Sequence, residues 1–172
     1  MRDAGKDPRR RRRGYGVIEF TIIGIPIIFL TVSIIEVSLA MWQYHTLAYA
    51  VSVTTRYVIT HGRSCSQNGN TCTITLGDVT TTFKNQAIAL DASKVNLTLY
   101  TQTATTTCNP LTSCTSSAAQ FPSTTDNGVN LDVTLVAKYP VSNPFPFFWP
   151  GSAPQSGGTF TLAATSRQRI VF

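Results

Sequence analysis

The sequence predicts an α+β protein in which a long N-terminal transmembrane helix extends outward and packs on a small antiparallel sheet with one further helix. Three observations lead to this fold class. A long apolar segment begins near Phe20, helical spacing returns near Asp78, and three later segments alternate apolar and polar residues as strands do. We expect a cytoplasmic basic leader over residues 1–14, a transmembrane and emergent helix over 15–62, and an outer α+β domain over 63–172.

The apolar segment is long enough to cross a bilayer. No charge lies between Phe20 and Ile35, and Glu36 is the sole charge between Phe20 and Trp42. About 20 residues, each rising about 1.5 Å, cover a hydrocarbon layer about 30 Å thick. Five consecutive arginines at 9–13 precede the segment, and this charge favours a cytoplasmic N-terminus with the rest of the chain outside.

Two alternatives for this region are a cleaved secretory signal peptide and a nucleic-acid-binding arm. The sequence Ser38-Leu39-Ala40 weakly resembles a signal-peptidase site, but the apolar core before it is longer than usual and contains Pro26. Arginine-rich arms also bind nucleic acids, yet an arm placed directly before a membrane segment favours control of topology. We therefore expect membrane lipid, and no nucleic acid, as a partner.

The helix should continue beyond the membrane to about Gly62, a residue type that often ends helices. Trp42 and Tyr44 are expected at the membrane interface. Apolar residues then recur at helical spacing and need a surface to pack on. This stripe consists of Leu47, Tyr49, Ala50, Val53 and Tyr57, widened by Val51, Val58 and Ile59.

Four cysteines in an exported domain indicate disulfides. Four cysteines allow three connectivities, and two short loops favour the pairs Cys65 with Cys72 and Cys108 with Cys114. A zinc site is the alternative, but these spacings are wider than those of zinc knuckles and the loops lack histidine. We expect no metal and no cofactor.

The outer domain should contain one helix and three strands. The helix begins with Asp78 as its cap and reaches Leu90. Residues 102–127 form a polar loop with the second cysteine pair, and residues 144–150 form a Pro- and Phe-rich cluster that is a candidate contact surface. The strands cover residues 95–101, 129–139 and 159–172, and Pro140 should stop the second one. Their apolar faces are Leu131, Val133, Leu135 and Ala137 in the second strand, and Phe160, Leu162 and Ala164 in the third.

The start of the chain resembles a type IV prepilin signal, because a basic arm and Gly14 precede a glutamate at the fifth following position, Glu19, and then an apolar helix. A cut after Gly16 would place Glu19 third and lose this pattern. The helix with Pro26 and Glu36, and the tail from residues 133–140 through a Pro/Phe stretch into the last strand, extend the likeness. The chain thus resembles the TadE-like family of pseudopilins from tight-adherence (Flp) pilus systems.

This resemblance implies cleavage by prepilin peptidase between Gly14 and Tyr15, and an assembly role for Glu19 and Phe20. The implied partners are prepilin peptidase, other pilin or pseudopilin subunits and the pilus assembly platform. The implied location is the bacterial inner membrane, with a periplasmic or extracellular C-terminal domain.

The resemblance implies a minor pilin-like component of the assembly or secretion apparatus. An enzyme is the rival class, but the sequence has no Gly-rich phosphate loop, and its two histidines, His45 and His61, lie in or beside the helix. An unprocessed, membrane-anchored adhesin is the other alternative. The TadE-, TadF- and TadG-like subfamilies all remain open.

Overall fold

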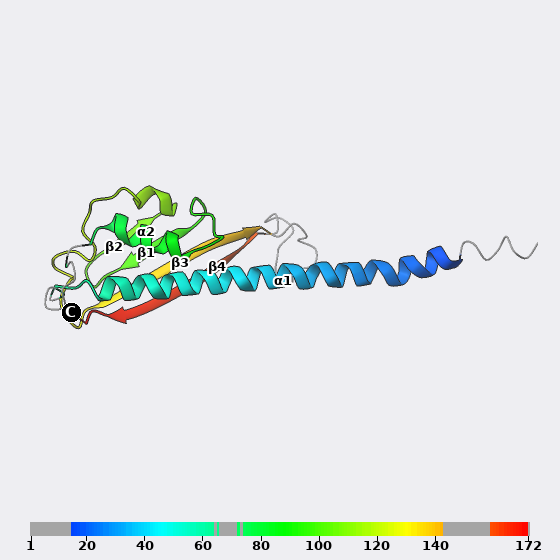
Figure 1. The fold of residues 1–172 in the computed structure, drawn as a ribbon, viewed down its shortest axis with the longest axis horizontal. Helices are drawn as coiled ribbons and strands as arrows, with labels where there is room; N and C mark the ends of the chain where they lie inside the picture. Colours follow the sequence, from blue (N-terminus) through cyan, green and yellow to red (C-terminus); the bar gives the residue numbers. More distant parts are fainter. Residues whose placement is uncertain (1–14, 64, 66–71, 73, 143–158, 172) are drawn as a thin grey trace, which may run out of the picture. The chain divides into compact units, whose positions relative to one another are not determined.

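The computed structural model describes residues 15–63, 65, 72, 74–142 and 159–171. These residues form an α+β arrangement of a long apolar helix, a second helix and a small antiparallel sheet, which confirms the predicted class (Figure 1). The chain divides into two compact units, Met1–Leu39 and Ala40–Phe172. The elements are α1 (Tyr15–Ile59), α2 (Leu76–Gln86), β1 (Asn96–Tyr100), β2 (Thr105–Cys108), the 3₁₀ helix η3 (Leu111–Cys114), β3 (Asp132–Ser142) and β4 (Thr159–Arg169).

In the first unit, α1 has the properties of a membrane span. It is the one helix in the described part of the chain that is long and apolar enough to cross a bilayer, and its most apolar stretch is not buried by the protein. Hydroxyl groups in this stretch donate to the carbonyl four residues earlier, as Thr21 does to Val17 (2.7 Å) and Ser38 to Ile34 (2.7 Å). Because bilayer lipid offers no hydrogen-bond partners, such internal pairing suits a helix in lipid.

In the second unit, α1 buries a stripe along one side. Leu47, Ala50, Val51 and Val58 are almost fully buried, as are two threonines, Thr54 and Thr55. The Thr55 hydroxyl donates to the carbonyl of Val51 at 2.7 Å, so this polar group keeps a hydrogen bond although it is buried. The prediction that Tyr49 belongs to this buried stripe was wrong, because its side chain is 60% exposed.

The sheet has the strand order β2-β1-β3-β4, with every pair antiparallel. Its buried face includes Leu97 and Leu99 of β1, which pair with Ala137 and Leu135 of β3. These side chains join the buried stripe of α1 and Phe83 of α2 in a single apolar core. The alternation of the second predicted strand is thus confirmed as an inward face. In the third, Ala164 is buried and Leu162 packs against the core, whereas Phe160 is only half-buried.

Two strand predictions were wrong in detail. β3 continues through Pro140 to Ser142, where it still pairs with β4. On its other side, β1 pairs with β3 only as far as Lys138. Beyond that point β3 has one open side, where a residue without an N–H group is tolerated. The predicted polar loop at 102–127 contains β2 and η3, since the threonine-rich segment 105–108 pairs with β1.

The helix boundaries also differ from those predicted. α1 ends at Ile59 rather than near Gly62, and α2 ends at Gln86 rather than Leu90. Thr75, not Asp78, caps α2: the amide of Asp78 donates to the Thr75 hydroxyl at 3.1 Å, and the Thr75 amide donates to the Asp78 carboxylate at 2.9 Å. Asp78 is thus the far partner of a capping box. The Thr75 amide and the Thr75 hydroxyl (2.7 Å) both donate to its carboxylate, and these two hydrogen bonds hold the pKa of that carboxyl below the ordinary value.

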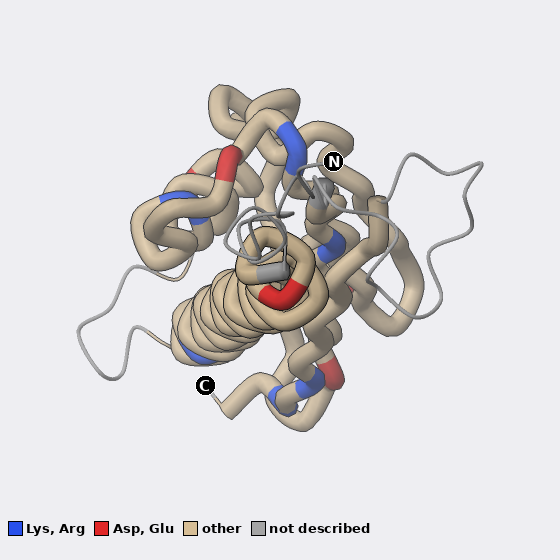
Figure 2. Tube along the Cα trace, turned by 90° about the vertical axis from the view of Figure 1, so that its right-hand side faces the viewer, with Lys and Arg blue, Asp and Glu red and all other residues tan. Residues whose placement is uncertain are grey.

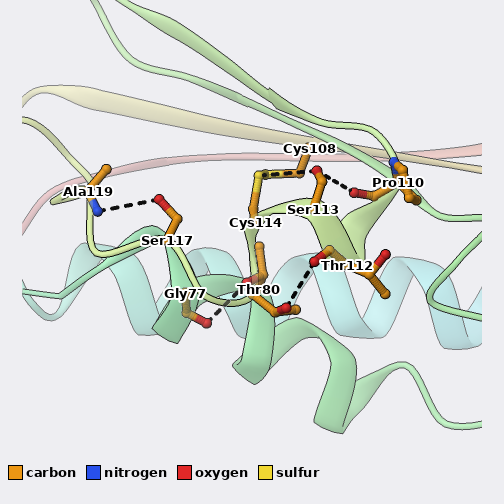
Figure 3. Close-up of a disulfide and its surroundings, with 10 residues drawn as sticks. Gly77, Thr80, Cys108, Pro110, Thr112, Ser113, Cys114, Ser117 and Ala119 are labelled. Atoms are coloured by element: carbon orange, nitrogen blue, oxygen red, sulfur yellow. Dashed lines mark hydrogen bonds between the residues drawn. A yellow bond between two sulfur atoms is a disulfide. The ribbon is translucent and has the colours of Figure 1, made fainter.

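The expected cysteine pairs are both present, Cys65 with Cys72 and Cys108 with Cys114. The second disulfide links the end of β2 to η3 and lies beside the start of α2 (Figure 3). The chain that follows η3 contacts α2 through two backbone hydrogen bonds: Gly77 donates to Ser117 (3.0 Å) and Leu76 to Ala119 (2.7 Å). This disulfide therefore anchors the segment that holds the first turn of α2.

Candidate processing and assembly site

The candidate site is the beginning of α1. Tyr15 is its first helical residue, so the helix begins at the position predicted to follow the cleaved bond. Gly14, the basic arm and the side chain of Tyr15 lie outside the described residues, as does the Pro- and Phe-rich cluster at 144–150. The scissile bond therefore stays a prediction.

Glu19 and Phe20 share a shallow groove on the first turns of α1. The groove has a volume of about 340 Å³ and is lined by Gly16, Glu19, Phe20, Ile23, Gly24 and Ile27. Along the helix, each of these positions has another three or four residues away, so all six lie on one helix face. An added Cβ at Gly16 would meet nothing within 4 Å, whereas one at Gly24 would lie 3.4 Å from the Phe20 ring. Gly16 therefore leaves room for another chain to approach this face closely, whereas the Phe20 ring covers Gly24.

The carboxylate of Glu19 is exposed on this face. The described part of the chain offers it no hydrogen-bond or ion-pair partner. An unpaired carboxylate that enters a bilayer costs on the order of a few kcal/mol. The arrangement can therefore accept a hydrogen bond or a positive charge from outside the described residues.

Glu36 is a second acidic group on α1. Its side chain is half-buried, and its Oε1 atom is buried without a hydrogen-bond partner among the described residues. A buried acceptor without a donor is costly, and such a group calls for a specific explanation.

Charged groups in the second unit are sparse and partly neutralise one another (Figure 2). Asp132 accepts from Arg167 at 2.7 Å and from Arg169 at 3.3 Å, and these guanidinium groups hold the pKa of its carboxyl below the ordinary value. Both arginines are well exposed, so this cluster is a surface ion pair of modest strength.

Both histidines contact nearby residues of α1. His61 Nδ1 lies 2.6 Å from the Tyr57 carbonyl, and its ring packs on the Tyr57 ring at a centroid distance of 4.4 Å. His45 contacts the ring of Tyr44 at 5.8 Å. Within the described residues, no three His, Cys, Asp or Glu side chains gather as a group able to hold a metal ion.

One family model matches the chain, that of the TadE-like proteins, over residues 14–56. The match begins at Gly14 and covers nearly all of α1, so the resemblance seen in the sequence is confirmed over this segment. No curated protein and no solved structure matches the chain.

Proposed function

We propose that this chain, which is TadE-like along its first helix, is a minor pilin-like component of a tight-adherence pilus assembly or secretion apparatus in the bacterial inner membrane. One observation carries the proposal: the family match begins at Gly14, directly before the first residue of α1, and α1 then presents the exposed carboxylate of Glu19, which has no partner among the described residues. The role is structural and not enzymatic. Its partners are prepilin peptidase, other pilin or pseudopilin subunits and the assembly platform.

In this proposal prepilin peptidase cuts the Gly14–Tyr15 bond on the cytoplasmic face and removes the basic arm. The new α-amino group of Tyr15 is positive and lies about 6 Å along the helix axis from Glu19, at about 1.5 Å per residue. Two opposite charges in a low-dielectric layer attract strongly, and each is costly when left alone. Glu19 then pairs with the amino group of a neighbouring subunit, and the groove beside it receives the neighbour's helix.

The processing step is tested by the mass of the mature protein in a strain with an active prepilin peptidase. We expect the mature chain to begin at Tyr15, and Gly14→Val to leave the chain uncut because the resemblance places the cut directly after this glycine. Gly16→Val is the matched control, since it changes a glycine two residues away and should still be cut. A wild-type chain that retains Met1 would contradict the processing and favour the membrane-anchored adhesin.

The assembly step is tested by crosslinking in the membrane. Glu19→Ala should leave insertion and cleavage largely intact, because it removes a charge and lengthens the apolar segment, but it should reduce the recovery of pilin-like partners. Glu19→Gln, which keeps the size and removes the charge, separates charge pairing from packing. If Glu19→Ala recovers partners as well as wild type does, the carboxylate has no role in assembly.

A further inference from the structure

A second groove lies in the outer unit, between α1 and the turn that follows α2. Its volume is about 400 Å³, and its lining is Trp42, His45, Thr46, Tyr49, Gln86 and Ile88. Among the described residues, no Asp, Glu, Lys or Arg side chain lines it. Ile88 is 71% exposed, Tyr49 60% and Trp42 52%. A cluster of large exposed apolar and aromatic side chains around one groove marks a contact surface rather than scattered surface residues.

Ile88 is held outward by a hydrogen-bonded turn. The amide of Leu90 donates to the carbonyl of Ala87 at 3.1 Å, which leaves Ile88 and Ala89 as the two central residues. Ala87 is buried and Leu90 packs against the core, so both ends of the turn are anchored. Turn centres usually contain Gly, Asn or Asp. Here an isoleucine stands at the tip, and Ala89 has a φ of 68°, a conformation that disfavours residues with a Cβ.

The position of the groove along α1 indicates what occupies it. α1 is one continuous helix from Tyr15 to Ile59, and its apolar segment reaches Trp42. Thr46 follows Trp42 by about 6 Å along the axis, at about 1.5 Å per residue. The polar interface on each side of a bilayer is about 5–8 Å thick, and Trp and Tyr are enriched there. The stretch of the groove from Trp42 to Thr46 therefore matches the depth of this layer.

We propose that this groove and the Ile88 tip bind the interfacial layer of the bilayer, where they contact phospholipid glycerol and upper acyl groups. This contact holds the outer domain against the membrane at a second point besides α1. The uncharged lining suits this layer, since apolar and aromatic side chains gain there and no charged side chain has to be desolvated. The inference rests on the proposed membrane insertion of α1.

The test uses the full chain in vesicles of phosphatidylethanolamine and phosphatidylglycerol with a nitroxide label on one added cysteine. All four native cysteines are in disulfides, so the added thiol is the site of labelling. The test variant is Ile88→Cys, and Leu30→Cys, at an exposed position in the apolar segment, reports insertion.

Val129→Cys is the matched control in the outer unit, since Val129 is also an exposed apolar residue. The residue after it, Asn130, donates its amide to the carbonyl of Ile170 at 2.9 Å. Val171, which follows Ile170, donates its amide to the carbonyl of Ile59 at the end of α1 (3.4 Å). Ile59 lies about 20 Å further along α1 than Thr46, at about 1.5 Å per residue. Position 129 is therefore expected in water.

The measurement compares collisions of each label with oxygen, which concentrates in lipid, and with a water-soluble nickel complex. We expect the oxygen-to-nickel ratio to be severalfold higher at positions 30 and 88 than at 129. A lipid-exposed label at 30 with equally aqueous labels at 88 and 129 overturns this inference and leaves the proposed insertion standing. An aqueous label at 30 overturns both. Spin–spin broadening at 88 without lipid contact overturns the inference in favour of a second copy in the groove.

Discussion

Replacing Gly77 by alanine tests the contact that holds the first turn of α2. A Cβ added at Gly77 would lie 2.8 Å from the carbonyl oxygen of Thr115 and 3.0 Å from that of Ser117. Both neighbours are backbone atoms in the segment after the Cys108–Cys114 disulfide, so they cannot rotate away as a side chain would. Gly77 also donates its amide to Ser117 at 3.0 Å. The substitution should therefore push the segment away and weaken this hydrogen bond.

Two opposing effects determine the size of this change. Alanine is favoured over glycine in a helix interior by up to about 1 kcal/mol, and less in a first turn. Overpacking costs about 1–3 kcal/mol, and loss of a net hydrogen bond costs about 0.5–1.5 kcal/mol. We expect the free energy of unfolding to fall by about 2 kcal/mol. For a domain of this size that corresponds to a loss of roughly 8 °C in Tm.

The assay is urea and thermal unfolding of the detergent-solubilised chain, followed by circular dichroism. Asn85→Ala is the control, because Asn85 is exposed in the same helix and its replacement should change the stability by less than about 0.5 kcal/mol. If Gly77→Ala is as stable as wild type or more stable, α2 does not depend on the close approach of residues 115–117, and the reasoning is refuted.

Two further predictions concern the second unit. Replacing Cys108 and Cys114 together by alanine should lower the free energy of unfolding by about 2 kcal/mol, because the disulfide closes a short loop with a sequence separation of 6. Reduction of the disulfide should lower it likewise, whereas zinc chelators should leave it unchanged. A destabilising effect of chelation would point to a bound metal. The hydroxyl of Thr101 donates to Asp126 and lowers the pKa of that carboxyl below its ordinary value of 3.8, although burial opposes this shift. The charged form thus stabilises the fold above about pH 4, and this contribution is lost as the pH falls through the lowered pKa. Asp126→Asn should destabilise the domain at neutral pH and flatten its acid unfolding curve, and an unchanged curve would show that Asp126 does not contribute.

Local sequence patterns determined the features of this protein that depend on neighbouring residues in the chain rather than on distant segments. An apolar segment of this length would be stable across a bilayer as a helix, so a helix able to span a membrane follows from composition. The alternation of Val133, Leu135 and Ala137 determines an inward strand face, since successive side chains point to opposite sides. Short spacing likewise favoured both cysteine pairs. In the candidate site, Glu19 was found because a carboxylate at the edge of an apolar segment stands out in the sequence.

Tertiary structure decided the features that depend on a distant partner. Pro140 stays within β3 because β1 has already ended beside it, and the threonines of β2 form a strand because β1 supplies the hydrogen bonds. Tyr49 has the spacing of a core residue but lies outside the buried stripe of α1. Ile88 joins Trp42 at one groove although more than 40 residues separate them in sequence. Local sequence encodes the preference of each segment, but burial and pairing depend on surfaces that distant segments supply, and these exist only once the chain has folded.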